Sequence, residues 1–252
     1  MLRLFKADLH IHTCLSPCTE LDMSPESILT AAKKKGIDII GICDHNSSEN
    51  SPGVFNAAKR MPIKVLPGLE VTSREEVHVL ALFDNLETAL RLQEHVYENL
   101  PGKNDEEAFG RQVIVNEKEE VEGFSDKLLI GATTIPLEEV IRLIHSWGGL
   151  AIASHIDREA FSLIGQLGFI PKNLALDALE ISPRIPVEEA MKTYAYDYPI
   201  TCSSDAHSPD DIGKGYTIFL LEEASLAEIK KALKNEEGRK LVLMKNPAES
   251  KS

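Results

Sequence analysis

The chain has 252 residues, of which 43% are hydrophobic and 27% charged, so it can bury a substantial core and has the composition of a globular protein. Its formal net charge of −13 at pH 7 argues against a broad basic face and against stable binding of duplex nucleic acid. No apolar run approaches the length of a membrane span and the N-terminus has no leader-like pattern, so we expect a soluble, cytoplasmic protein without membrane contact.

Apolar runs with the length of a strand alternate with helical patterns along most of the chain. The first helix is expected to take Ser24 as N-cap and Pro25 as its first residue, and to end at Gly36. In chain order, strands are predicted at residues 3–12, 37–45, 63–71, 77–83, 150–155, 175–182, 198–207, 215–222 and 240–244. Helices are predicted at residues 23–36, 51–61, 85–100, 137–149, 158–168, 186–195 and 225–235.

The alternation stops between residues 101 and 136, where the sequence becomes rich in acidic residues and glycine. A segment of this length rarely builds a core of its own. We therefore interpret it as a partly helical, acidic insertion in a single domain that spans residues 1–252.

The repeated strand–helix units predict an α/β fold with parallel strands covered by helices, either a barrel or an open doubly wound sheet. Polar residues favour the barrel, because they gather at the carboxyl ends of several strands rather than at one switch point. These residues are His10, His12, Asp44, His45, Glu70, His155, Asp205 and His207. We expect a distorted (β/α)7 barrel with its site at the carboxyl ends of the strands.

The H-x-H spacing places His10 and His12 on one face of their strand, because successive side chains alternate between faces. Two imidazoles at this spacing can converge on one ion, although the pair alone also suits a structural role. His78, in another predicted strand, adds a further candidate ligand. Imidazole and carboxylate ligands suit Zn, Mn or Fe, and a bridging carboxylate can hold two such ions. We interpret Asp8 as a carboxylate that orients one ligand imidazole.

Each candidate also has an ordinary structural explanation. A single histidine at a strand end is more often hydrogen-bonded than metal-bound, and Asp44 could merely cap the following turn. His95 and His145 lie in predicted helices and receive no role, while Arg158 and Glu180 could be surface charges. The coincidence of metal-competent residues at several strand ends nevertheless favours a metal site.

Taken together, these residues resemble the PHP superfamily (polymerase and histidinol phosphatase), whose members share a distorted seven-stranded barrel and a site for two or three metals. The resemblance rests on motifs in the family's order, namely H-x-H at His10 and His12, D-H at Asp44 and His45, G-x-E at Gly68 and Glu70, His78, His155, and D-x-H at Asp205 and His207. It implies that His10, His12, Glu70 and Asp205 hold one metal, and that a bridging Glu70 joins His78 and His155 around a second. His45 and His207 would share a third with one ligand from the loop after H-x-H.

That loop departs from the family, since many relatives carry Asp or His where this chain reads "TCLSPCTELD". Cys18, Glu20 and Asp22 are the available substitutes: family spacing favours Cys18, and an oxygen-preferring metal favours Glu20. A zinc knuckle built on Cys14 and Cys18 is the competing interpretation, but no matching cysteine pair completes it.

The leading hypothesis is a metal-dependent phosphoesterase that hydrolyses a small phosphomonoester or a nucleotide-type phosphate, with two or three divalent ions (Zn, Mn or Fe). A metal-activated water would attack phosphorus, and Asp205 or His207 would protonate the leaving oxygen. Arg158 and Arg184 would bind the phosphate oxygens, unless they are ordinary exposed arginines. Phosphate or sulfate should occupy the same site. The alternatives are a nuclease that acts on nucleic acid ends and a non-catalytic metal-binding PHP module.

Overall fold

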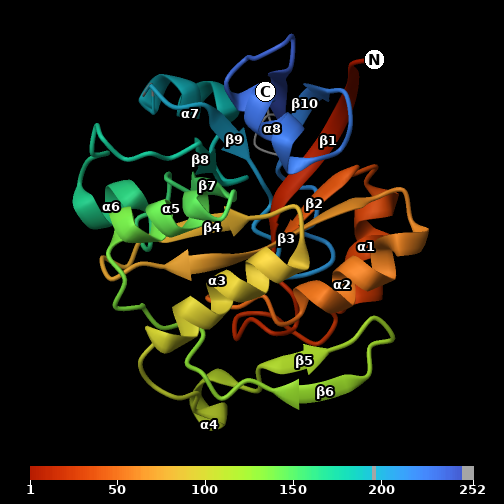
Figure 1. Ribbon diagram of the computed structural model, residues 1–252, viewed down its shortest axis with the longest axis vertical. Coiled ribbons are helices and arrows are strands. Elements are labelled where there is room, and N and C mark those ends of the chain that lie inside the picture. Colours follow the sequence, from red (N-terminus) through yellow and green to blue (C-terminus); the bar gives the residue numbers. More distant parts are fainter. Residues whose placement is uncertain (195–196, 246–252) are drawn as a thin grey trace.

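The computed structural model describes residues 1–194 and 197–245, and a curled sheet runs through the centre of this part of the chain (Figure 1). Among the described residues the sheet has nine strands in the order β11-β10-β1-β2-β3-β4-β7-β8-β9. The strands are β1 (Arg3–Ile11), β2 (Ile39–Ile42), β3 (Lys64–Thr72), β4 (His78–Leu82), β7 (Leu150–Ala153), β8 (Ala178–Ile181), β9 (Ile200–Cys202), β10 (Tyr216–Leu221) and β11 (Lys240–Lys245). The expected distorted barrel is confirmed in the form of this curled, half-barrel sheet.

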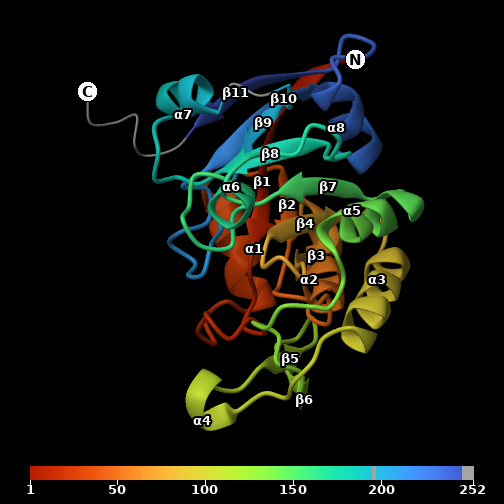
Figure 2. The same cartoon turned by 90° about the vertical axis from the view of Figure 1, so that its left-hand side faces the viewer.

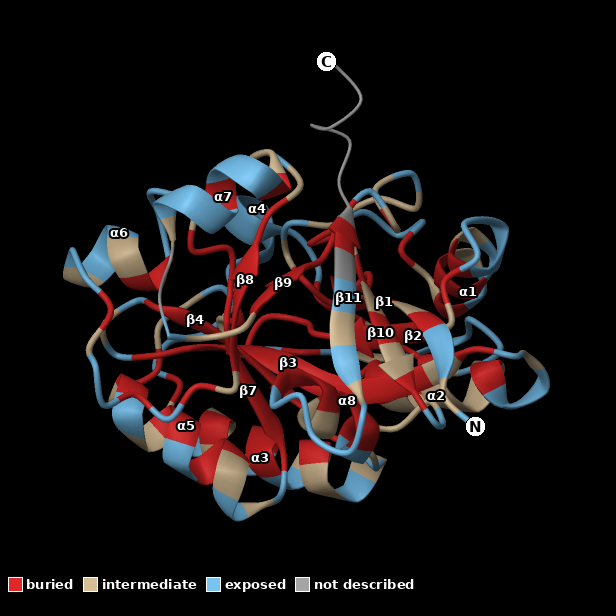
Figure 3. Ribbon diagram, turned by 90° about the horizontal axis from the view of Figure 1, so that it is seen from above, coloured by how far each residue is buried: buried red, intermediate tan, exposed pale blue. Residues whose placement is uncertain are grey.

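Helices surround the curled sheet, as Figure 3 shows from above. They are α1 (Pro25–Lys34), α2 (Ser51–Ala57) with a 3-10 turn η1 (Ala58–Arg60), α3 (Leu86–Glu98), α5 (Leu137–Ser146), α6 (Leu163–Leu167), α7 (Val187–Thr193) and α8 (Leu226–Leu233). Helix α1 begins after Ser24 with Pro25 at its start, as predicted, and Gly36 follows it with φ of 66°. Helix α6 is much shorter than predicted, because it starts only after its N-cap Ser162. The predicted end of the next helix at residue 195 lies outside the described residues.

Strand direction differs from the prediction in one respect that matters for the site. Strands β1, β2 and β3 are parallel to one another, as are β7, β8 and β9, but β4 is antiparallel to both β3 and β7. The short connection from Thr72 to His78 explains this, since a parallel neighbour would require a crossover of a dozen or more residues. Strands β10 and β11 also pair in antiparallel fashion.

The loop after β9 is attached to the end of β1. Ala206 pairs with Ile11, accepts a hydrogen bond from the backbone N–H of His12 at 3.1 Å and donates one to the carbonyl of His10 at 3.2 Å. Asp8, fully buried on β1, accepts hydrogen bonds from the backbone N–H groups of Ser204 at 2.9 Å and Gly213 at 2.8 Å. Asp8 therefore fixes this loop, and the prediction that it orients an imidazole is wrong.

Separate apolar clusters fill the two sides of the sheet. Inside the curl, Leu9, Leu80, Ile152 and Phe219 pack with residues of α8. Outside, a larger cluster lies beneath α3, α5, α6 and α7, and another beneath α1 and α2. Apolar side chains therefore pack on both faces of the sheet, and polar residues lie at the ends of the strands.

The insertion extends away from the edge of the sheet where β1 ends (Figures 1 and 2). It contains one helical turn, α4 (Glu106–Phe109), as the expectation of a partly helical segment requires. It also contains a two-stranded hairpin of β5 (Val113–Val115) and β6 (Val121–Phe124), which was not predicted from the sequence. Val113 and Val115 pack against Cys14 in the loop after β1. The hairpin therefore supports the loop that borders the site. No helix in the described ranges is both long and apolar enough to span a membrane.

The glycine of the G-x-E motif has a specific steric role. A Cβ on Gly68 would lie 2.2 Å from the carbonyl oxygen of Ala81 on the antiparallel neighbour β4. We predict that Gly68→Ala lowers the free energy of unfolding by about 1–3 kcal/mol or more, measured by urea denaturation. Gly123→Ala in β6 is the control, because its Cβ would meet only Ile114 Cδ1 at 3.9 Å. Equal stability of the two variants would contradict this explanation.

Candidate metal centre

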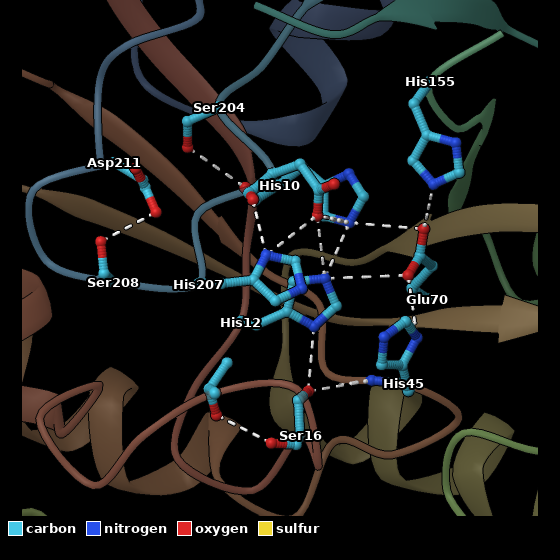
Figure 4. Close-up of polar contacts among 12 residues, drawn as sticks. His10, His12, Ser16, His45, Glu70, His155, Ser204, His207, Ser208 and Asp211 are labelled. Carbon is cyan, nitrogen blue, oxygen red and sulfur yellow. Dashed lines mark hydrogen bonds and ion pairs between the residues drawn. The ribbon is translucent and has the colours of Figure 1, made fainter. Parts of the chain in front are cut away.

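The predicted ligands converge at one edge of the sheet, although they are far apart in the sequence; Figure 4 shows His10, His12, His45, Glu70, His155 and His207 among them. His10 lies on β1 and His12 just after it, Glu70 lies on β3, and His45, His155, Asp205 and His207 follow β2, β7 and β9. His78 is instead the first residue of β4. Because β4 runs antiparallel to its neighbours β3 and β7, its first residue lies beside the carboxyl ends of those two strands.

Glu70 is the centre of this arrangement. Its carboxylate is 1% exposed, and its oxygens lie 3.0 Å from His45 Nδ1, 3.0 Å from His78 Nδ1, 3.3 Å from His155 Nε2 and 3.4 Å from His10 Nε2. Burial by itself would raise the pKa of Glu70, but the surrounding imidazoles, His78 and His10 foremost, hold it well below its usual range. Glu70 is therefore a buried carboxylate that keeps its negative charge.

Asp205 forms a second anionic position beside the first. Its Oδ1 lies 3.1 Å from His12 Nε2 and 3.3 Å from His10 Nε2, while its Oδ2 lies 2.6 Å from Arg158. Burial opposes ionisation, yet His10 and His12 keep the pKa of Asp205 well below its usual range. Both oxygens are thus engaged by nitrogen atoms.

The donor atoms form overlapping sets of the size that a metal ion requires. Within each set the ligand atoms lie within 4.8 Å of one another, and no other such set occurs among the described residues. The sets are His10, His12 and Asp205; His45, Glu70 and His78; and His12, Cys18, His45 and His207. His155 joins the second set through its 3.3 Å contact with Glu70.

Unpaired polar atoms test whether these residues fit a cation. Glu70 Oε1, His45 Nδ1, His78 Nδ1 and His155 Nδ1 are buried without a hydrogen-bond partner in the described structure. Such atoms normally cost free energy, since burial removes their hydrogen bonds to water. His45 Nδ1 and His78 Nδ1 each lie 3.0 Å from an oxygen of Glu70, without the geometry of a hydrogen bond. Imidazole and carboxylate ligands suit Zn, Mn or Fe. The residues present therefore fit divalent metal ions.

Buried groups hold two of the ligand imidazoles from behind. His10 donates through Nδ1 to Glu180 Oε1 at 2.9 Å, which leaves its Nε2 directed at Glu70 and Asp205. Glu180 is 1% exposed on β8, so the suggestion that it is a surface charge is wrong. A glutamate within a short apolar strand, the same pattern as Glu70, was the signal in the sequence that could have identified it.

His12 has an analogous support. Its Nδ1 donates to Ser16 Oγ at 2.9 Å, and Ser16 donates in turn to Asp44 Oδ1 at 2.6 Å. Asp44 also accepts from the backbone and hydroxyl of Thr13, both at 2.7 Å. Asp44 therefore caps the turn after β1 and fixes His12 through Ser16, rather than facing the metal sets itself.

Among the three loop candidates, the fold brings Cys18 to the histidines. Cys18, although it is itself exposed, belongs to the set with His12, His45 and His207, whereas the exposed Glu20 and Asp22 belong to none. Burial tends to raise the pKa of the Cys18 thiol, but contacts with His207 and His45 lower it to about 7. Cys14 is buried beside Val113 and Val115 instead, so the two cysteines form no knuckle.

The two arginines have different surroundings. Arg158 is half-buried and its guanidinium contacts Asp205, so the interpretation of an ordinary exposed arginine is wrong for it. Arg184 is exposed and lines the same cavity of about 620 Å³ that opens over the metal sets. His95 and His145 lie away from the centre and pair with Glu98 and Asp177, as expected for residues without a role.

Backbone strain accompanies the site. His155 and Asp205 have φ of 31° and 51°, in the left-handed region that residues other than glycine rarely adopt. Such conformations cost about 1–3 kcal/mol each and persist where the surrounding structure fixes them. In these conformations His155 contacts Glu70, and Asp205 contacts His10 and His12.

The PHP domain family matches residues 8–234 of this sequence. The chain belongs to the PHP family. This confirms the resemblance noted from the motifs, and structures of PHP-like metal-dependent phosphoesterases share the fold. One is a two-domain protein from Bacteroides vulgatus that contains a predicted PHP-like metal-dependent phosphoesterase, with a TM-score of 0.52, 17% identity, and coverage of 93% of this chain and 63% of that chain.

Further similarities involve one curated relative and two structures of endonuclease Q, whose chains are longer than this one. Uncharacterized protein MJ1587 of Methanocaldococcus jannaschii is 34% identical over 88 residues, which is 32% of this chain and 51% of that protein. The lesion-specific endonuclease PfuEndoQ of Pyrococcus furiosus has a TM-score of 0.75 at 22% identity, covering 96% of this chain and 58% of that chain. A complex of endonuclease Q with a 27-mer duplex carrying an abasic lesion gives a TM-score of 0.74 at 21% identity, covering 96% and 59%. This PHP chain therefore spans somewhat more than half of endonuclease Q, and the likeness shows the fold.

The support of His10 by Glu180 leads to a prediction about metal affinity. Glu180→Gln should weaken metal binding about 10- to 100-fold, because the imidazole loses the carboxylate that fixes its orientation and raises its basicity. Competition with a chelator, followed by metal analysis of the protein, measures the change. Glu188→Gln, at an exposed position of α7, is the matched control. Equal affinity of both variants would contradict the role of Glu180.

Cys18 leads to a spectroscopic prediction. Protein loaded with Co²⁺ should show a thiolate-to-cobalt charge-transfer absorption that Cys18→Ser abolishes and Cys14→Ser retains. Cys14 is the appropriate control, because it lies in the same loop but outside every metal set. Persistence of the absorption in Cys18→Ser would show that the thiolate ligand is another residue.

Proposed function

We propose that this PHP protein is a metal-dependent phosphoester hydrolase that acts at the Glu70 centre with two or three divalent ions of Zn, Mn or Fe. The observation that carries the proposal is the buried Glu70 carboxylate with four imidazole nitrogens within 3.0–3.4 Å of it. His10, His12, Glu70 and Asp205 would hold one ion, and Glu70, His78 and His155 a second. Cys18, His45 and His207 would hold a third, which favours Cys18 over Glu20 as its loop ligand.

The reaction would replace the phosphorus–oxygen bond to the leaving alcohol with a bond from phosphorus to a water oxygen, and the leaving oxygen would take up a proton. Bound divalent cations would neutralise phosphate charge and make water acidic enough to act near neutral pH. Asp205 is a poor proton donor, because His10, His12 and Arg158 engage both of its oxygens. This favours the half-buried His207, which lines the cavity, as the group that protonates the leaving oxygen in the protein with two ions, where its Nε2 is not needed for a third ion.

The phosphate would be held by Arg184 and the metal centre. Arg184 is exposed on the cavity wall and bidentate hydrogen bonding to phosphate oxygens is typical of a guanidinium group. Arg158 contributes less directly, since its contact at 2.6 Å with Asp205 already occupies it. We therefore assign Arg158 a positioning role on Asp205 and keep Arg184 as the phosphate ligand.

Two substrate classes remain to be separated. A cavity of about 620 Å³ and a net charge of −13 favour a small phosphomonoester or a nucleotide. The structural match to endonuclease Q, which covers 96% of this chain, favours a nuclease instead. It bears against the expectation that duplex DNA is excluded. Turnover of nucleotides and an aryl phosphate, compared with turnover of single-stranded DNA and of duplex DNA with an abasic site, distinguishes the two. A non-catalytic PHP module agrees less well with the assembled set of donor atoms.

The catalytic proposal predicts complete dependence on metal and on Glu70. Chelation should abolish hydrolysis of an aryl phosphate, and Zn, Mn or Fe should restore it. Glu70→Gln should lower kcat/KM by more than about 100-fold, since loss of a bridging ligand exceeds the loss caused by removing a supporting group. His95→Gln, in the half-exposed part of α3, should retain full activity. Full activity after chelation, in protein shown to be free of metal, would contradict the proposal.

A further inference from the structure

The cavity above the Glu70 centre has two chemically different walls. The polar wall consists of residues of the metal sets together with Asp157, Arg158, Glu159 and Arg184. The other is apolar and is formed by Ile130, Ala160, Phe161 and Ile185 from loops outside the sheet. Ile130 and Phe161 are 37% and 38% exposed, which is high for large apolar side chains beside a buried site. Hydrolysis of the phosphate needs only the polar wall, so the apolar wall is available to contact another part of the substrate.

Phe161 is held rigidly at the border between the two walls. Its ring stacks on the His78 imidazole, with centroids 4.8 Å apart and an interplanar angle of 16°. Its carbonyl accepts a hydrogen bond from the backbone N–H of His78 at 2.9 Å, and its φ of 57° lies in the left-handed region. A bulky residue adopts this conformation only where its surroundings enforce it. The plane of the ring is therefore fixed relative to His78, whose Nδ1 lies 3.0 Å from Glu70.

We infer that the apolar wall binds a planar ring in the leaving group, so that the substrate is a nucleoside phosphate whose base stacks on Phe161. This inference rests on the proposed phosphoester hydrolysis. One face of the Phe161 ring contacts His78, and the exposed remainder of the ring lines the cavity. Aromatic side chains bind nucleobases of any sequence by stacking, because every base has a π face. The phosphate then lies between the metal sets and Arg184, with the base beside Ile130 and Phe161.

A phosphate with a base one sugar away is present both in a free nucleotide and in a nucleotide within a DNA strand. In both, a base follows the phosphate at the distance of one sugar, whereas a phosphorylated sugar or glycerol offers no planar aromatic ring to stack. The competing explanation is that Phe161 only shields His78 and keeps it oriented. In that case the substitution of Phe161 would affect metal content and all substrates equally.

Phe161→Leu separates the two explanations, because leucine keeps an apolar cover on His78 but has no planar face. Adenosine monophosphate and glycerol phosphate are the paired substrates, and oligonucleotides in single-stranded and duplex form are added to identify the source of the base. We expect the KM for adenosine monophosphate to rise about ten-fold, since a stacked base is worth ~1–3 kcal/mol. The KM for glycerol phosphate and the metal content should stay within about two-fold. Phe161→Trp should preserve the preference for adenosine monophosphate, and Phe169→Leu, at an exposed phenylalanine outside the cavity lining, is the matched control.

A binding measurement makes the result independent of turnover. Calorimetric titration of metal-loaded protein with the non-hydrolysable phosphonate analogue of adenosine monophosphate and with methylphosphonate gives the preference for a base directly. Loss of this preference in Phe161→Leu supports the inference. An equal effect on both ligands, a loss of metal from the variant, or the absence of any preference in the unaltered protein overturns it. Base-dependent binding without hydrolysis of any phosphoester would instead contradict the proposed function and would support only the stacking of a base on Phe161, not its place in a leaving group.

Discussion

The structure depends on the burial of one carboxylate, Glu70, at a position from which solvent is excluded. A buried negative charge is costly unless positive or hydrogen-bonding groups compensate for it. Four imidazoles from β1, β4 and the ends of β2 and β7 surround it, so the strands must place their ends at the same edge of the sheet. The antiparallel direction of β4 is part of this requirement, because it brings His78, the first residue of the strand, to that edge.

Buried polar groups hydrogen-bond to the ligand imidazoles on the side away from Glu70 and hold them in place. Glu180 fixes His10, and Asp44 fixes His12 through Ser16, so each imidazole keeps Nε2 directed toward the carboxylates. Asp8 ties the loop that carries Asp205 to β1. The site is thus assembled from several strands whose apolar cores on both faces of the sheet hold the backbone, and the left-handed residues His155 and Asp205 complete it.

The sequence contained enough information to predict the alternating elements and every imidazole of the cluster, because apolar runs that end in histidine or carboxylate are visible without a structure. The role of Glu180 was missed, although this glutamate lies within a short apolar strand as Glu70 does, because no sequence motif connected it to His10. The direction of β4 followed from the short connection to β3, a signal that the expectation of a uniform parallel barrel obscured. The choice of Cys18 over Glu20 depended on how the loop after β1 turns, and the hairpin that supports this loop was not foreseen. Global charge did not show that two arginines line the cavity of this acidic protein, beside four carboxylates.

The central claim is that Glu70 bridges metal ions held by this ring of histidines. Anomalous diffraction from crystals of metal-loaded protein tests it most directly, because it locates the ions independently of activity. The account predicts at least two metal peaks on either side of the Glu70 carboxylate, each about 2.0–2.2 Å from one of its oxygens and bound by the histidines assigned above. Active, metal-loaded protein whose ions lie elsewhere, with Glu70 contacting none of them, would contradict it.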